Sequence, residues 1–340
     1  MPPSEAVTPI VETRGLGKYF PVRRGAWGRI RGWVRAVEDV NLQVWPGETL
    51  GVVGESGCGK TTLGRLILRL LDATSGAAYF QGRNLADLDG RELRSLRRHM
   101  QMVFQDPYGS LNPRMRVRTL LGEGLRIHGI VEGRMSARVA ELLERVGLPA
   151  GAASRYPHEF SGGQRQRIGI ARALAVNPAF VVADEPVSAL DVSVQGQIVN
   201  LLQDIQRDLG LTYLFIAHDL GVIRHVADRV AVMYLGRIVE IATRDQLFGS
   251  PSHPYTRALM ASVPVPDPAA RRQRVVLGGD VPSPARVPVG CAFHPRCPEA
   301  RDRCRRELPG LVDPGDGRRV ACLLRDPASG PARAGAHQES

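Results

Sequence analysis

Long apolar runs are missing from this sequence, and aromatic residues make up only 5% of it. No stretch approaches the roughly 20 apolar residues that a membrane-spanning helix needs. The N-terminal Met1–Val11 has no basic start followed by an apolar core, so we expect no secretory signal. We therefore expect a chain that is cytosolic, or attached to a membrane only through partners. With 340 residues, 43% of them hydrophobic, it can bury one large domain with an appendage.

The charge balance is strongly basic, with 45 lysines and arginines against 34 acidic residues and a formal charge of +11. Such a charge suits nucleic acid, anionic lipid headgroups or a plain preference for arginine. The denser basic groups, at 23–35, 91–98 and 301–306, come with neither aromatic-rich RNA motifs nor a zinc-finger helix. We interpret the charge mainly as a solvated surface, with a nearby membrane as the second interpretation.

Lysine itself is scarce, because it occurs only at positions 18 and 60. Lys60 lies in a stretch that fits the phosphate-loop pattern G-x-x-x-x-G-K-[ST], between a strand pattern at Thr49–Val53 and a helical pattern at Leu63–Leu71. Lys60 should reach the β- and γ-phosphates, and the Thr61 hydroxyl should bind a magnesium ion. A glycine-rich turn without a ligand is the alternative. The ATP-binding residues expected here are Gly54, Glu55, Ser56, Gly57, Cys58, Gly59, Lys60, Thr61 and Thr62.

Two apolar segments end in candidate catalytic residues. Phe180–Glu185 is typical of a buried parallel strand closed by two acids, at the edge where α/β proteins place ligands. Asp184 would hold the magnesium, and Glu185 would polarise the attacking water. His218 follows the apolar Tyr213–Ala217 and could contact the γ-phosphate. Paired acids are often only a helix cap and a lone histidine is usually structural, but the phosphate loop in the same chain favours catalysis.

A second glycine-containing turn precedes the helical pattern at Ile168–Val176. Ser161 can cap that helix, and the glycines expose backbone N–H groups at its positive end. One nucleotide does not easily need both helix ends of one chain, so we expect two subunits to pair head to tail. Each would lend Ser161, Gly162, Gly163 and Gln164 to the nucleotide on the other's Lys60. An ordinary helix cap is the alternative.

An aromatic pair, Tyr19 and Phe20, lies ahead of the phosphate loop. Either ring could stack on adenine, and core packing is an equally good interpretation of the local residues. Helical periodicity over residues 111–150 predicts a helical insertion between the phosphate loop and the serine-glycine turn.

The order of these motifs resembles the ATP-binding subunit of an ATP-binding-cassette (ABC) transporter over about residues 11–245. The resemblance implies an α/β fold, a P-loop NTPase cassette in residues 1–245 with a RecA-like core, a helical subdomain at about 106–165 and an antiparallel β region. It implies that Gln105 senses the γ-phosphate and magnesium and links the site to a membrane partner docked on the helical insertion. It also places Asp191 in the D-loop and favours Phe20 over Tyr19 for adenine.

Finer resemblance lies in Gln105–Tyr108, Ser110–Pro113 and Ser252–Thr256, which are similar to segments of the oligopeptide/dipeptide/nickel importer subfamily. The basic loop after Phe20 resembles the second, "F-type" ATPase of such systems. The implied partners are a paralogous ATPase subunit, two integral membrane permease subunits and, indirectly, an external solute-binding protein. The implied place is the cytoplasmic face of the cell membrane.

A soluble ABC ATPase acting on nucleic acid is the competing function, which the net charge supports. Such proteins usually carry long coiled coils, two cassettes or zinc insertions, and this chain has none, so we expect no nucleic-acid partner. A regulatory, inactive cassette is disfavoured by the complete set of catalytic residues.

Four of the five cysteines crowd an extension at residues 246–325. A reducing compartment disfavours a disulfide framework, and four thiolates suit zinc or an iron–sulfur cluster. The wide spacings lack C-x2-C pairs and favour a cluster, and tails of the resembled importer family are associated with a [4Fe–4S] cluster. Zinc is the second interpretation and free thiols the third. The expected ligands are Cys291, Cys297, Cys304 and Cys322. Residues 326–340 are expected to be disordered.

Overall fold

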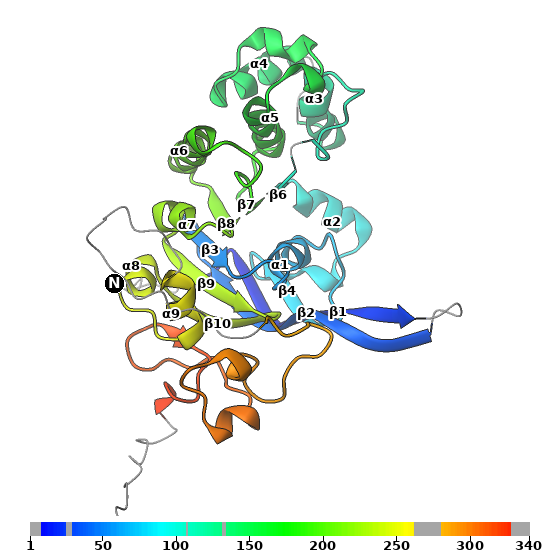
Figure 1. Cartoon of the computed structure of the whole chain (residues 1–340). Helices are drawn as coiled ribbons and strands as arrows, with labels where there is room; N and C mark the ends of the chain where they lie inside the picture. The colour runs from blue at the N-terminus through cyan, green and yellow to red at the C-terminus, as the bar shows by residue number, and fades with distance from the viewer. Residues whose placement is uncertain (1–7, 25–28, 107, 131–133, 262–279, 328–340) are drawn as a thin grey trace, which may run out of the picture.

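The computed structural model describes residues 8–24, 29–106, 108–130, 134–261 and 280–327, which form two sheets with helices around them (Figure 1). The larger sheet has seven strands in the order β11-β10-β9-β3-β8-β7-β6. They are β3 (Thr49–Val53), β6 (Met100–Val103), β7 (Phe180–Asp184), β8 (Thr212–Ile216), β9 (Arg229–Tyr234), β10 (Arg237–Thr243) and β11 (Arg319–Val320). The five strands from β9 to β6 run parallel, while β10 and β11 are each antiparallel to their neighbours.

Alternate residues of the parallel strands face two separate cores. Leu214 and Ile216 of β8 pack in the core that contains α1, whereas Tyr213 and Phe215 pack in the core that contains α6 and α7. These helices are α1 (Lys60–Ile67), α6 (Val192–Leu209) and α7 (Leu220–Val226). Every residue of β3, β7 and β8 is buried, which explains their continuous apolar sequences. The expected α/β class is confirmed.

The smaller sheet is antiparallel and has the order β2-β1-β4-β5. Its strands are β1 (Val11–Arg24), β2 (Arg29–Val44), β4 (Ser75–Phe80) and β5 (Arg83–Asn84). The β1–β2 hairpin projects from the body of the molecule in Figure 1. Val40 and Phe80 of this sheet share a core with Leu63 and Ile67 of α1, so the sheet packs on the α1 side.

A group of helices lies between β6 and β7 in the chain and forms the upper part of Figure 1. It contains α3 (Val117–Ile127), α4 (Met135–Arg145) and α5 (Gly162–Leu174), with the short 3-10 turns η2 (Ala150–Ser154) and η3 (Pro157–Glu159). Leu121, Leu142 and Ile168 join these helices in a shared core. Ahead of β6 lie η1 (Leu85–Asp87) and α2 (Gly90–Arg97). Within the described ranges, no helix has the length and apolar character needed to cross a bilayer.

The C-terminal segment returns to the central sheet. After α8 (Arg244–Gly249), α9 (Pro254–Ala261), η4 (His294–Arg296) and η5 (Asp302–Arg305), strand β11 pairs with β10 and becomes its edge. The extension is therefore continuous with the core through backbone hydrogen bonds. The expected disorder of 326–340 falls almost wholly on residues 328–340, which lie outside the described residues.

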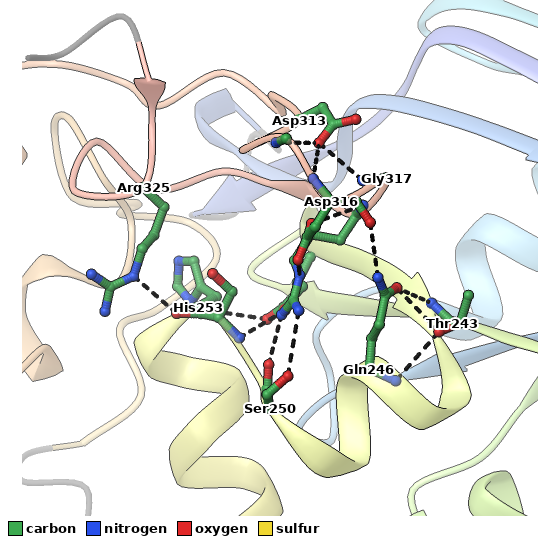
Figure 2. A network of polar contacts seen from close by, with 12 residues as sticks. Thr243, Gln246, Ser250, His253, Asp313, Asp316, Gly317 and Arg325 are labelled. Carbon is green, nitrogen blue, oxygen red and sulfur yellow. Dashed lines mark hydrogen bonds and ion pairs between the residues drawn. The ribbon is translucent and has the colours of Figure 1, made fainter.

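A buried carboxylate also ties the extension to β10. Figure 2 shows the network of polar contacts around it, in which Ser250 and His253 lie close to Asp316. Glu240 is fully buried and accepts hydrogen bonds from the backbone N–H groups of Ser252 and His253, each at 2.9 Å. The Arg318 guanidinium lies 3.7 Å from the same carboxylate and donates to the Ser250 carbonyl at 2.6 Å. Arg318 also binds the Asp316 carboxylate at 2.5 Å, so the guanidinium has a second acidic partner, whereas Glu240 is compensated by Arg318 and the two N–H groups.

We predict that Glu240→Ala lowers the free energy of unfolding by about 2–4 kcal/mol, because it leaves two backbone N–H groups without their acceptor and removes one of the two carboxylates beside the buried Arg318. Urea unfolding of the whole chain measures this. Glu307→Ala, which breaks the exposed ion pair with Arg303, is the control and should leave the midpoint unchanged. Equal midpoints for the two variants would contradict the role of the buried carboxylate.

Candidate active site

The loop between β3 and α1 requires glycine at two positions for steric reasons. Gly54 and Gly59 have φ of 153° and 109°, and a Cβ at either would lie about 2 Å from a backbone oxygen, 2.1 Å from Met233 O and 2.0 Å from Ala36 O. Gly57 also has a positive φ, of 76°. The loop therefore curls tightly against the end of β9 and the middle of the hairpin strand β2, a shape whose backbone N–H groups can surround an anion. Two of these groups, in Glu55 and Cys58, are bonded within the chain.

Lys60 is buried inside this loop. Its ammonium donates to the carbonyl oxygens of Gly54 at 2.7 Å and Glu55 at 3.1 Å. Burial raises the pKa of the Cys58 thiol, so this small side chain stays neutral beside it. Ser56 is exposed, and Thr61 and Thr62 are half-buried at the start of α1. The arrangement presents one compact positive charge at the N-terminus of a helix.

Asp184, at the end of β7, faces the first turn of α1. Its carboxylate accepts a hydrogen bond from the Thr61 hydroxyl at 2.9 Å. Burial raises the pKa of this carboxyl, and the Thr61 hydrogen bond opposes the rise only in part. A carboxylate and a hydroxyl side by side are oxygen donors of the kind that Mg²⁺ takes beside bound phosphates. The residues present therefore fit a magnesium ion.

Three strand ends meet at Glu185. One carboxylate oxygen of Glu185 accepts a hydrogen bond from Gln105 Nε2 at 2.8 Å and lies 3.2 Å from His218 Nδ1. The Glu185 side chain is only 15% exposed, whereas that of His218 is 58% exposed. Glu185 also has a positive φ of 46°, and its backbone N–H donates to the Ile216 carbonyl of β8. Such backbone strain at a non-glycine residue is typical of functional sites.

The serine-glycine turn caps α5. Ser161 Oγ accepts from the Gln164 N–H at 3.4 Å, and Gln164 Oε1 accepts from the Ser161 N–H at 3.1 Å. Ser161, Gln164 and Asp191 are exposed, and Gly162 and Gly163 are half-buried. Across the described residues, no hydrogen bond joins this turn or Asp191 to the phosphate loop of the same chain. The single chain thus brings together the phosphate loop, Asp184, Glu185, Gln105 and His218, but not the turn.

The two aromatic candidates are neighbours on β1, opposite Arg35 and Val34 of β2. Phe20 is 37% exposed, with the Lys18 ammonium 5.5 Å from its ring centre, while Tyr19 is half-buried. Adjacent residues of a strand point to opposite faces, so one ring at most can face a nucleotide.

Two contacts to the phosphate loop come from the C-terminal extension. The Tyr255 hydroxyl accepts a hydrogen bond from the Glu55 N–H at 3.0 Å, and the Arg296 guanidinium binds the Glu55 carboxylate through two hydrogen bonds of 3.0 and 3.1 Å. Sequence reasoning missed both. Tyr255 lies in the Ser252–Thr256 segment that carried the importer resemblance, but nothing in the local pattern joins it or Arg296 to a loop 200 or more residues away.

The four cysteines of the extension lie within electrostatic reach of one another. Burial, with smaller contributions from the three other thiols, raises the pKa of Cys291 to about 11. All four are free of disulfides, yet nowhere in the described ranges do three or more Cys, His, Asp or Glu side chains form a group able to hold a metal ion. Metal ligation needs thiolates, which this burial disfavours. The expected [4Fe–4S] or zinc site is not supported.

The loop and side chains that meet at this edge of the sheet define a class of protein. A phosphate loop after β3, an acidic pair at the end of β7 and polar side chains after β6 and β8, all on one edge of a parallel sheet, are the arrangement of a P-loop nucleoside triphosphatase.

Comparisons with known proteins give the family. The family described as "ABC transporter" matches residues 37–188, and "Oligopeptide/dipeptide transporter, C-terminal region" matches 239–304. The chain is 56% identical to the probable peptide ABC transporter ATP-binding protein y4tS of Sinorhizobium fredii, over 94% of this chain and 91% of that protein. It is 51% identical to the oligopeptide transport ATP-binding protein AppF of Bacillus subtilis, over 93% and 97%. The ATP-binding cassette MJ0796, solved as a dimer bound to ADP and Pi, is 30% identical with a TM-score of 0.61 over 69% of this chain and 98% of that one.

The chain therefore belongs to the ATP-binding subunits of ABC transporters, in the oligopeptide/dipeptide family, and is an ABC-type ATPase. The expected cassette fold is confirmed. The relatives described above are named as transporter subunits, so the nucleic-acid alternative is not supported. The "F-type" designation is not retained, because the comparisons identify the family and not one of two paired ATPase subunits.

We predict that Glu185→Gln lowers the ATPase kcat by about 10²–10⁴-fold, because the amide cannot accept the proton of an attacking water. Nucleotide binding should survive, so size-exclusion chromatography with ATP should show an accumulated dimer. Glu141→Gln, at an exposed site on α4, is the matched control and should behave as the wild type. Full ATPase activity in Glu185→Gln would remove the catalytic assignment.

We predict that Asp184→Asn stabilises the nucleotide-free chain at neutral pH by about 0.5–2 kcal/mol while lowering Mg²⁺-dependent ATPase activity by about 10- to 100-fold. Burial raises the pKa of Asp184 in the folded state, so its ionised form opposes folding above that pKa. The stability gain should shrink as the pH falls through the folded-state pKa and vanish below the ordinary pKa of the unfolded chain, where the carboxyl is neutral in both states. Urea unfolding across pH measures it, and a destabilised variant at neutral pH would refute this account.

Proposed function

We propose that this chain is the ATP-hydrolysing subunit of an importer for dipeptides or oligopeptides. The observation that carries the solute class is the match of residues 239–304 to the C-terminal region of oligopeptide/dipeptide transporters, together with relatives named for peptide transport over more than nine tenths of this chain. The inferred partners are two integral membrane permease subunits and, through them, an external solute-binding protein. The subunit would work at the cytoplasmic face of the membrane without crossing it.

The phosphate loop is proposed to hold ATP. Its N–H groups and the Lys60 ammonium would bind the β- and γ-phosphates, and Phe20 would stack on the adenine ring. Lys60 now uses the carbonyls of Gly54 and Glu55 as acceptors, so phosphate oxygens would take over part of that role. Thr61 and Asp184 would hold Mg²⁺, which neutralises charge on the phosphates when it is bound.

Glu185 is proposed as the group that accepts the proton of the attacking water. Gln105 and His218 hold the same oxygen of its carboxylate, so they fix its orientation. His218 Nδ1 faces the Glu185 carboxylate, and Nε2 on the other side of the ring would need to carry a proton to donate to a phosphate oxygen. Gln105 begins the segment between β6 and the helical group. A movement of Gln105 at the nucleotide site would therefore pass along this segment to the helices.

A second ATPase subunit is proposed to complete the site. Ser161, Gly162, Gly163, Gln164 and Asp191 do not reach the phosphate loop of their own chain, and three of these five are exposed. Two chains paired head to tail would bring each serine-glycine turn to the nucleotide of the other. A paralogous subunit is the proposed partner, with a second copy of this chain as the alternative.

The permease is proposed to dock in a groove between the sheet and the helical group. This groove has a volume of about 530 Å³, and Phe104, next to Gln105, lines it. Two of its apolar lining residues are unusually exposed, Ile127 at 59% and Leu70 at 44%. Exposed apolar side chains rimmed by arginines mark a protein contact site. A membrane subunit bound there would sense movements of Gln105 through Phe104.

We predict that proteoliposomes holding this chain with its permeases and binding protein take up labelled oligopeptides only when ATP is hydrolysed, and that Ile127→Asp lowers uptake about tenfold or more while the ATPase of the isolated chain is unchanged. Leu209→Asp, an exposed leucine at the end of α6 outside the groove, is the control and should transport normally. Uptake of nickel without peptides would overturn the solute class. Normal coupling in Ile127→Asp would overturn the docking groove.

A further inference from the structure

The phosphate loop is held from outside by the C-terminal extension. Glu55, the second residue of the loop, has its carboxylate bound by Arg296 and its N–H bound by the Tyr255 hydroxyl. The two partners lie 241 and 200 residues further along the chain. Arg296 thus fixes the direction of the Glu55 side chain, and Tyr255 fixes the Glu55 backbone.

The Arg296 guanidinium faces Glu55 and also lies beside the Tyr234 hydroxyl. The side chain of Arg296 is 7% exposed, and both of its side-chain hydrogen bonds within the described residues go to Glu55. The planar guanidinium binds the two carboxylate oxygens in parallel, a geometry that fixes orientation as well as distance. A buried ion pair adds little net stability compared with apolar packing, so this one is better explained by the geometry it imposes.

Packed aromatic rings anchor the turn that carries Arg296. Phe293, three residues earlier, is buried against Tyr234 and Tyr255, with ring centres 5.4 Å from each, and Tyr234 and Tyr255 are 4.6 Å apart. Tyr234 ends β9 directly after Met233, whose carbonyl forms the wall that excludes a Cβ at Gly54. The same strand end therefore supports both the loop and the extension that holds it.

The position of Glu55 matters for the ammonium of Lys60. Lys60 Nζ donates to the carbonyls of Gly54 and Glu55, so a displaced Glu55 backbone moves one of the two acceptors that aim it. We propose that the extension is part of the nucleotide site, with Arg296 and Tyr255 as positioning residues that hold the phosphate loop in its ATP-binding shape. This rests on the ATP-binding role of the loop proposed above.

The test is the kinetics of the full-length chain. We expect Arg296→Gln to raise the KM for ATP about tenfold or more while kcat changes by less than about threefold, because a displaced loop weakens binding before and during reaction alike. Arg296→Lys keeps the charge without the fork and should fall between the wild type and Arg296→Gln. Tyr255→Phe keeps the ring packing and should raise KM in the same direction.

The matched control is Arg303→Gln. Arg303 also binds a carboxylate through two hydrogen bonds, to Glu307, on the same extension, but this pair is exposed and local. Its loss should leave KM unchanged. In the double variant Glu55→Gln with Arg296→Gln, the rise in KM should not exceed that of either single variant, because both remove the same contact.

A fluorescent ATP analogue with Mg²⁺, measured by equilibrium binding, separates this proposal from the function itself. Suppose that the wild type binds the analogue and that both Arg296→Gln and Tyr255→Phe bind it as tightly as the wild type. The positioning role is then refuted, even if the melting temperatures of the variants fall. If the wild type does not bind it, the ATP-binding role fails, and this inference fails with it. Should Arg296→Gln not fold, Glu55→Gln and Tyr255→Phe decide the question.

Discussion

The parallel pairing of β6, β7, β8 and β3 fixes where the chemistry of this chain lies, because parallel strands bring their carboxyl ends to one edge of the sheet. The phosphate loop follows β3, and Gln105, Glu185 and His218 follow β6, β7 and β8. Gln105 and His218 are 80 and 33 residues from Glu185 in sequence, yet both reach the same carboxylate oxygen. Strand order alone makes these contacts possible, so a different order would separate the three side chains.

Where the information is local, sequence was enough to predict the structure. Strands buried on both faces need continuous apolar runs, and the helix after a phosphate loop needs glycine before it, so β3, β7, β8 and α1 all follow from short patterns. Asp184 and His218 lie directly at or after such a run, which is why each was a candidate, whereas Gln105 became one through the resemblance to the ABC family. The left-handed backbone of Glu185 had no such sign, because a glutamate in that conformation is held there by its surroundings.

Contacts between distant segments were beyond sequence reasoning. No local pattern in Arg296 or Glu55 specifies that one binds the other, and β11 is a two-residue strand whose pairing with β10 depends on the whole extension returning to the sheet. The spacing of the cysteines led to an unsupported expectation of a metal site, also because a sequence pattern does not give positions in space. Spacing counts the residues between thiols but does not fix the directions of the side chains, and burial here favours neutral thiols over the thiolates that a metal requires.

The chain uses arginine where the extension meets the core and lysine inside the phosphate loop, and the geometry of the acceptor oxygens explains this difference. The extension joins the core through two buried arginines, Arg318 at Glu240 and Arg296 at Glu55. The Glu55 carboxylate offers two coplanar oxygens, which a guanidinium fork binds in parallel. Inside the phosphate loop the acceptors are single oxygens pointing from different directions, and only the compact, rotatable ammonium of Lys60 can bind them in so small a space. An arginine there would displace the loop that Arg296 holds in place.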